Sequence, residues 1–322
     1  RRLLEQPGQA TPERAMRAAV LALTQGHPDE GLAWLEASQQ QPPKPELATD
    51  YWRLTSELAE SRRRVPLAIA AYRKLLQAKN AQVGDFDGLI RLLRLDYPLD
   101  AAQISAHAWE RYGEPRHLLD ALTVYSGRTQ WDAFAKLLKP LESESPANRA
   151  TLALLWKSPE FLRLVGTWHQ NQGRMAEARR LFEAGLRASP NSTDMQQALL
   201  WHFIDGNDTV SLRTLLATHE QKWSRSEEVH DALASSYQAL SLPQTALDRY
   251  LTPRFKARQT DFLWLMNYAD ALDQNQQADR AWRLRRHLLS REWQATVVGQ
   301  SGSRLTRAQA RQRWLTDEGL DQ

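Results

Sequence analysis

The side chains that could perform catalysis or bind a metal are scattered through this sequence of 322 residues. Eight histidines are present, but no two are three or four residues apart, the spacing that would place two imidazoles on one helix face as metal ligands. The absence of cysteine excludes thiolate ligands, thiol nucleophiles and disulfides. Neither a glycine-rich phosphate loop nor a GxSxG nucleophile motif occurs. The sequence therefore predicts no enzyme, no metal site and no cofactor.

Charged residues are unevenly distributed along the chain. Residues 280–322 hold nine arginines against four acids, whereas the rest holds 33 basic and 34 acidic residues. A surface that tracks phosphates needs basic side chains along its whole length, so this distribution opposes nucleic acid as the ligand. Four arginines are the candidate basic docking patch: Arg280, Arg283, Arg286 and Arg291. The alternative is that they form the solvated side of a last repeat.

Helices must position these side chains. Ala, Leu, Arg, Glu and Gln, which favour helices, dominate the composition, while 14 Gly and 15 Pro are few for the turns of a many-stranded sheet. A unit of about 34 residues recurs and is clearest at residues 159–192. There Gly166 on a first helix is expected to face Ala178 on a second, because two small residues let helix backbones approach, and Pro190 ends the second helix. We predict an all-α fold.

The period covers most of the chain. A first array (12–148) is expected to hold units at residues 12–45, 49–82, 83–116 and 115–148, and a second (159–295) units at 159–192, 193–226, 227–260 and 262–295. Three units carry bulky residues where small ones are expected, and we predict that their helices splay: Ile90; Leu122 and Phe134; Leu200 and Leu212. Outside the period lie residues 1–11, an irregular helical connector at 149–158, and a flexible C-terminal segment at 296–322 with a short helix at 307–315.

This spacing of small, bulky and turn residues resembles the tetratricopeptide repeat. The resemblance implies an α-solenoid of about eight stacked helix pairs that forms a superhelix, with a concave groove lined by first helices. In the second array, the groove-facing offsets from the helix crossing, with the adjoining Asp205, supply seven acids and one tryptophan as candidate groove residues: Glu160, Asp194, Trp201, Asp205, Glu228, Asp231, Asp270 and Asp273. The same offsets supply one arginine, Arg163, and each carboxylate is expected to face water.

An acidic groove attracts cationic ligands through its summed field. Trp201, next to a crossing position, could stack on a sugar or on a partner side chain. The alternative is a solvated helix face without a ligand and an ordinary packing role for Trp201. Five other tryptophans are expected to pack in the core: Trp34, Trp52, Trp131, Trp282 and Trp293.

Two stretches are similar to the periplasmic repeat region of the PelB family, the outer-membrane exporters of the Pel exopolysaccharide: LWHFIDGN at residues 200–207 and DFLWLMNYA at residues 261–269. This resemblance implies a periplasmic scaffold within a longer outer-membrane protein that carries a β-barrel. It implies two partners, a PelA-like polysaccharide deacetylase and hydrolase, and the cationic amino-sugar polysaccharide itself. The alternative is a cytosolic adaptor whose groove binds a peptide or helix of a partner protein.

Overall fold

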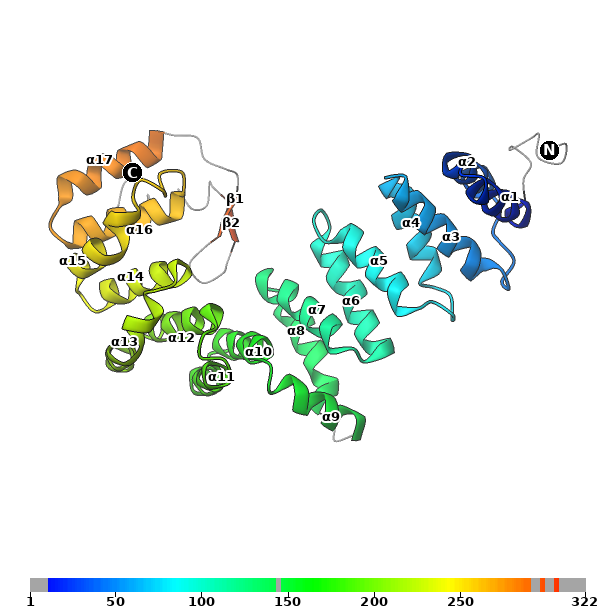
Figure 1. Cartoon of the computed structure of the whole chain (residues 1–322). Helices are drawn as coiled ribbons and strands as arrows, with labels where there is room; N and C mark the ends of the chain where they lie inside the picture. Colours follow the sequence, from blue (N-terminus) through cyan, green and yellow to red (C-terminus); the bar gives the residue numbers. More distant parts are fainter. Residues whose placement is uncertain (1–10, 143–145, 291–295, 299–303, 307–322) are drawn as a thin grey trace. The chain divides into compact units, whose positions relative to one another are not determined.

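The computed structural model describes residues 11–142, 146–290, 296–298 and 304–306 (Figure 1). The chain divides into two compact units, unit 1 up to Val124 and unit 2 from Tyr125. Apolar side chains of the successive helices form separate buried clusters in unit 1 and in unit 2. Each unit is therefore an array of helix pairs with its own core.

Unit 1 contains α1 (Pro12–Thr24), α2 (Pro28–Ser38), α3 (Ala48–Ser61), α4 (Val65–Leu75), α5 (Val83–Leu93), α6 (Pro98–Tyr112) and most of α7 (Pro115–Gly127). Unit 2 contains α8 (Trp131–Leu138), α9 (Pro146–Leu155), α10 (Pro159–Asn171), α11 (Met175–Ala188), α12 (Thr193–Asp205), α13 (Thr209–Trp223), α14 (His230–Ala239), α15 (Pro243–Ala246), α16 (Phe262–Gln274) and α17 (Ala278–Ser290). Seven of the eight predicted repeats correspond to one helix pair within one unit, and the repeat at 115–148 supplies α7 and α8 on either side of the unit boundary. The predicted all-α repeat fold is confirmed.

Short irregular pieces complete unit 2. Three are 3₁₀ turns, at Lys139–Glu142, Glu227–Val229 and Thr252–Arg254, and one is a π-helical turn at Leu247–Leu251 that continues α15. An antiparallel ladder pairs β1 (Thr296–Val298) with β2 (Arg304–Thr306). It was not expected from the sequence, and it is the only β structure in the part of the chain that the structure describes.

The turns inside the helix pairs share one conformation. In seven of the eight pairs a three-residue turn joins the helices, and its central residue has a positive φ: Gly26, Arg63, Thr129, Gly173, Asn207, Ser241 and Gln276. This left-handed residue closes the first helix and reverses the chain. Proline at the first or second position begins α1, α2, α4, α6, α10 and α15, where its missing N–H costs no hydrogen bond.

Helix crossings follow the predicted small residues. Ala178 is fully buried in the pair α10–α11, and a Cβ placed on Gly166 would lie 2.6 Å from the Phe182 ring. In the pair α1–α2, Gly31 lies against the backbone of Ala19, with only 3.2 Å between its added Cβ and the Ala19 carbonyl oxygen. Gly166 thus faces the Phe182 ring, one turn beyond the expected Ala178 on α11, and this ring occupies the space over the glycine.

In the unit at residues 193–226, bulky residues at the crossing separate the helices, as predicted. Leu200 and Leu212 are buried between α12 and α13, and the two backbones approach closely at far fewer positions than those of α10 and α11. The buried side chains still stabilise the pair, since full burial of a leucine contributes about 1.5–3 kcal/mol. The consequence is a more open outer side at α13.

The segment predicted as an irregular connector at 149–158 belongs largely to a regular helix. α9 extends from Pro146 to Leu155, and a turn leads to Ser158, whose Oγ accepts a hydrogen bond from the Phe161 N–H at 3.4 Å and caps α10. α9 forms no pair of its own, so it is an additional helix between the repeats. Residues 1–10 and the helix predicted at 307–315 lie outside the described residues.

Candidate binding face of unit 2

First helices of unit 2 carry the predicted acidic residues. α10, α12, α14 and α16 line the inner side of this array, and α11, α13 and α15 its outer side (Figure 1). Glu160 and Asp194 lie exposed in the first turns of α10 and α12, and Glu228 lies in the 3₁₀ turn that leads into α14. Asp270 and Asp273 lie on α16.

Three of these carboxylates form ion pairs with arginines that the sequence analysis did not place in the groove. Asp231 contacts Arg254 at 2.6 Å and Arg258 at 3.5 Å. Arg285 of α17, only 6% exposed, binds Asp270 at 3.0 Å and Asp273 at 2.9 Å. These three carboxylates do face water, with 41–44% of each side chain exposed, but each is also paired with an arginine, which was not expected. The groove residues were predicted from first-helix positions only, whereas these arginines come from a second helix and from the segment that follows one.

Two other predicted acids connect neighbouring repeats. Asp205 accepts a hydrogen bond from the Gln170 amide at 3.0 Å, and Glu228 accepts one from the Thr193 hydroxyl at 2.6 Å. Desolvation by the surrounding helices raises the pKa of Asp205, although the hydrogen bond from Gln170 opposes this. Both carboxylates retain exposed surface, so each combines a structural contact with a charge that a ligand can reach.

Trp201 lies on the same helix face as two of the acids. Along α12, Asp194 precedes it by seven residues and Asp205 follows it by four, distances of about 10 Å and 6 Å along the axis. Trp201 is half-buried and packs against the core of unit 2, which holds its indole in place. A fixed aromatic ring between two carboxylates is suited to a ligand with a flat apolar face and positive charges beside it.

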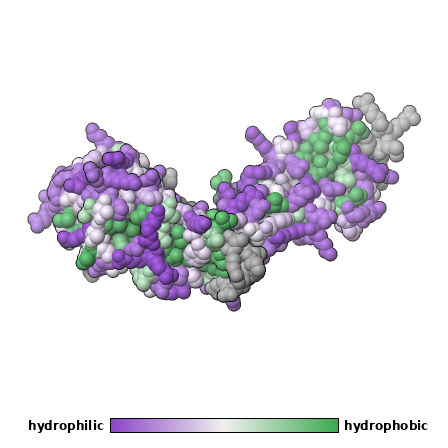
Figure 2. All heavy atoms as spheres, turned by 60° about the horizontal axis from the view of Figure 1, so that its bottom comes forward, coloured by the Kyte–Doolittle hydropathy of each residue, from purple (hydrophilic) through white to green (hydrophobic). Residues whose placement is uncertain are grey.

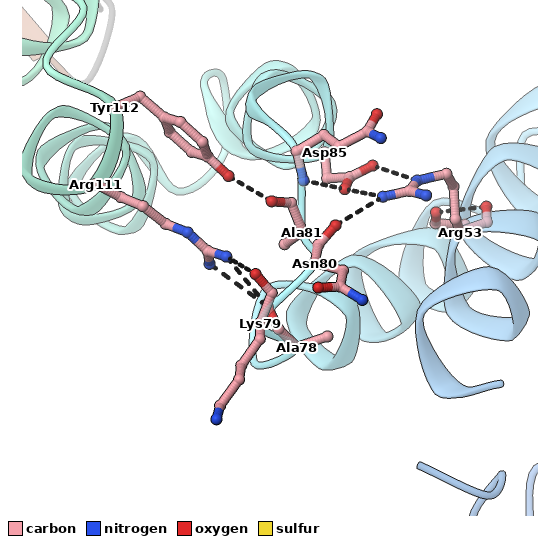
Figure 3. A network of polar contacts seen from close by, with 10 residues as sticks. Arg53, Ala78, Lys79, Asn80, Ala81, Asp85, Arg111 and Tyr112 are labelled. Atoms are coloured by element: carbon pink, nitrogen blue, oxygen red, sulfur yellow. Dashed lines mark hydrogen bonds and ion pairs between the residues drawn. The ribbon is translucent and has the colours of Figure 1, made fainter. Parts of the chain in front are cut away.

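In unit 1 several first-helix charges are paired with charges of the neighbouring repeat. Arg53 of α3 binds Asp85 of α5 through two hydrogen bonds of 3.0 and 2.7 Å, and Asp85 also accepts the Gln82 N–H at 2.7 Å (Figure 3). From the other side of the same loop, Arg111 donates to backbone carbonyls of residues 78 and 79, and Tyr112 donates to that of residue 81. These contacts fix the loop between α4 and α5. Two further ion pairs link neighbouring repeats of unit 1, Arg91–Glu60 and Arg94–Asp120.

The predicted basic patch lies on α17 as far as the structure describes it. Arg280, Arg283 and Arg286 are exposed, and Arg291 lies outside the described residues. Trp282, expected in the core, is 50% exposed beside them, so that expectation is wrong. The buried stripe of α17 consists instead of Ala281, Arg285 and Leu288, which are one turn apart. Trp293 also lies outside the described residues.

The remaining candidate groups have structural contacts. His202 is only 5% exposed, and its Nδ1 forms a hydrogen bond with the Gln170 side-chain oxygen at 2.9 Å. Its pKa is lowered, mainly by desolvation and also by the positive charge of the nearby Arg179. Among the described residues, no group of three or more His, Asp or Glu is placed to hold a metal ion. Over the same residues, no helix combines the length and apolar character needed to cross a membrane.

The sequence contained some signals for the contact residues that had not been predicted, Gln170 and Arg285. Partners in the inter-repeat contacts are one repeat apart, as are Gln170 and Asp205. Arg285 occupies the buried stripe of its helix, where an arginine requires an acidic partner. The partner itself could not be identified from this stripe, because the pairing depends on how α16 and α17 cross.

Stacked antiparallel helix pairs, closed by a recurrent left-handed turn and crossing at small residues, define an α-solenoid of helical-hairpin repeats. Residues 4–294 match the tetratricopeptide repeat, and the chain belongs to that family. It is thus a repeat scaffold of the kind that mediates protein–protein interaction. No curated protein matches the sequence.

Solved structures with similar folds are distant in sequence. The apo form of the quorum sensor NprR from B. thuringiensis is 11% identical, with 87% of this chain and 86% of that chain covered and a TM-score of 0.47. The human IFIT1 dimer with PPP-AAAA is 14% identical, with coverages of 91% and 71% and a TM-score of 0.48. At these TM-scores the likeness carries no argument about the ligand of this chain.

Proposed function

We propose that the chain is a non-catalytic scaffold of bacterial exopolysaccharide modification and export, located in the periplasm as part of an outer-membrane protein. In this proposal the inner face of unit 2 guides a cationic, partly deacetylated amino-sugar polymer of the Pel type. The scaffold also binds the PelA-like deacetylase and hydrolase that modifies this polymer. Membership of the tetratricopeptide repeat family supports a scaffold role. The setting is inferred only from the resemblance of residues 200–207 and 261–269 to the PelB family.

The observation that carries the proposal is the exposed face of α12. Trp201 is partly exposed and can stack on a sugar ring, while Asp194 and Asp205 can attract ammonium groups on neighbouring sugars. Glu228, bound to Thr193 at the start of α12, extends the negative surface toward the next repeat. Asp231, Asp270 and Asp273 contribute less field, because their arginine partners offset their charge.

Calorimetry with partly deacetylated chitin oligomers as the probe tests this face. A variant with Asp194→Asn, Asp205→Asn and Glu228→Gln loses three inner-face charges. Its matched control loses three exposed acids of the second helices, through Glu177→Gln, Asp248→Asn and Asp279→Asn. We expect the first variant to bind at least about tenfold more weakly and the control to bind within about twofold of the wild type. Wild-type affinity should also fall with salt, since the Debye length shortens from ~30 Å at 0.01 M to ~3 Å at 1 M.

Equal losses in the two variants would overturn the assignment of this face. If a lysine-rich peptide binds the inner face and the oligomer does not, the chain is a peptide-binding adaptor instead. Trp201→Phe separates stacking from charge, because it retains an aromatic ring of smaller area and leaves the carboxylates intact.

The scaffold proposal also concerns catalysis and enzyme docking. The purified chain is expected neither to hydrolyse nor to deacetylate the oligomer, and turnover that follows the protein through repurification would contradict this.

The exposed Arg280, Arg283 and Arg286 of α17 form the proposed docking patch for the modifying enzyme. Reversal of these three charges to Glu should weaken the enzyme complex without changing oligomer binding.

A further inference from the structure

A groove lies between α11 and α13 on the outer side of unit 2. Its volume is about 550 Å³, and side chains of α12 form its floor. α13 borders the groove from Val210 to Lys222, a length of about 18 Å or more than three helical turns. In Figure 2 this side of the molecule faces the viewer, with hydrophobic surface next to hydrophilic side chains. The groove is thus distinct from the inner face that carries the acidic residues.

The floor and walls of the groove are largely apolar. Leu199 and Phe203 come from α12, and Leu186 and Leu215 come from the two flanking helices. Val210, at one end of the groove, is 76% exposed. Burial of such surface by a partner would stabilise a complex by the hydrophobic effect.

The hydroxyl and imidazole groups along the middle of the groove already have partners. The hydroxyls of Thr214 and Thr218 donate to carbonyls of their own helix at 3.0 and 2.9 Å. The His219 ring stacks on the Trp223 ring with 4.8 Å between their centroids. Desolvation, and to a lesser extent the positive charge of Lys222, lowers the pKa of the His219 imidazole. A small polar ligand would therefore find few free partners, whereas an apolar helix face needs none.

The two ends of the groove differ in charge. At the N-terminal ends of the helices, Arg179 donates to Ser211 at 3.2 Å, contacts Glu183 and Asp208 at 2.8 and 3.6 Å, and lies over the Phe203 ring. This arginine is neutralised and bridges the two helices. At the other end, Lys222 forms no ion pair with the described residues, and Arg187, 70% exposed, reaches Glu183 only at 4.0 Å.

We propose that this groove binds an amphipathic helix of a protein partner, of about 12 residues, whose first turn is acidic. The apolar stripe of the helix would pack on the accessible side chains of Val210, Leu186 and Leu215, and its acidic turn would lie beside Arg187 and Lys222. The partner helix then runs antiparallel to α11 and α13. Its dipole favours this direction, because its positive end meets the negative C-terminal ends of both helices.

A pair of synthetic helical peptides provides the probe. Both have capped ends and leucines at every third or fourth position, but one carries its Asp and Glu residues in the first turn and the other carries them in the last. Fluorescence anisotropy with the labelled peptides measures their affinity for the full chain. We expect the peptide with the acidic first turn to bind at least about tenfold more tightly, equivalent to about 1.4 kcal/mol.

Two variants locate the binding site. Arg187→Glu with Lys222→Glu reverses the basic end and should weaken the preferred peptide at least about tenfold. The matched control, Arg180→Glu with Arg213→Glu, changes the same net charge on the same two helices outside the groove and should have an effect below about twofold. Thr218→Trp, at an exposed position on the groove wall, should fill the groove and block both peptides.

Several results would overturn the proposal. These are no binding to the wild type, equal losses in the two charge-reversal variants, or unchanged binding by Thr218→Trp. Sedimentation of the chain alone tests a second copy as the occupant, since a dimer that the Arg187→Glu and Lys222→Glu reversal dissociates would replace the helix partner. None of these substitutions touches the inner face, so oligomer binding there serves as an independent check of folding.

Discussion

Glu220 is a carboxylate in unit 2 on which several hydrogen bonds converge. From α13 it accepts the Tyr237 hydroxyl at 2.7 Å, the Tyr250 hydroxyl at 2.6 Å and the Arg249 guanidinium at 2.9 Å. Burial alone would raise the pKa of Glu220, but these donors outweigh it and lower the pKa from 4.5. Burial and the Glu220 charge together raise the pKa of Tyr237 to about 12. One ionised side chain thus joins α13 to both helical segments of the next repeat.

Glu220→Gln is expected to destabilise the protein by about 1.5–3 kcal/mol at pH 7, the usual range for hydrogen bonds to a charged group. Because folding lowers the pKa of Glu220, its contribution is complete above pH 4.5 and is lost as the pH falls through the lower folded value. Urea unfolding of both proteins should therefore give stabilities that converge below pH 4.5. Glu46→Gln, at an exposed position, serves as the control. A stability difference that is the same at low and neutral pH would contradict this assignment.

Helix crossings are the elements that determine the geometry of each repeat. Where Gly166 meets Phe182, the ring lies directly on the backbone of α10, and the two helices approach closely. Where Leu200 and Leu212 occupy the crossing, α12 and α13 lie farther apart, and the groove proposed to bind a helix lies beside α13. The size of two side chains thus determines whether a repeat is closed or open on its outer side.

Gly166→Leu should destabilise unit 2 by about 1–3 kcal/mol, because its side chain must displace the Phe182 ring from a packed crossing. Thermal melting measures the loss. Gly127→Ala is the matched control, since no atom lies within 4 Å of its added Cβ, and helix propensity should leave stability unchanged or slightly higher. An unchanged melting temperature for Gly166→Leu would mean that the crossing is not at this position.

For the whole molecule, the important feature is the division into two units with separate cores. Repeats in a solenoid contact only their neighbours, so stability is the sum of local terms and can differ along the chain. The buried Arg285, bound to Asp270 and Asp273, stabilises the last helix pair of unit 2. Loss of this contact should therefore act locally.

Asp270→Asn together with Asp273→Asn should reduce the stability of the α16–α17 pair by about 2 kcal/mol, because Arg285 loses both of its charged partners. Hydrogen exchange followed by mass spectrometry should show faster exchange in α14, α16 and α17 and unchanged exchange in unit 1. Uniform acceleration in both units would show instead that the chain unfolds as one cooperative body. Asp194→Asn, an exposed control in the same unit, should change neither region.

The positions of the helix pairs could be read from the sequence. Small residues at the crossings and prolines at helix starts determine the local structure of the few residues around them. Their spacing therefore predicts the repeat, whatever packs around it. Gly166, Ala178 and Pro190 set one register, and the other units follow by the period. The side-chain types that exclude thiol chemistry and phosphate loops are equally independent of the fold.

Only the tertiary structure showed which charged side chains pair with each other and which side chains are exposed. Asp270 and Asp273 have the same sequence signature as Asp194, yet Arg285 reaches only the first two because α17 crosses α16 beside them. Trp282 fits an apolar helical pattern but lies outside the stripe that α17 buries. The groove between α11 and α13 likewise arises from side chains of three helices. Each of these features depends on the angles and distances between helices, which follow from packing of side chains distant in sequence.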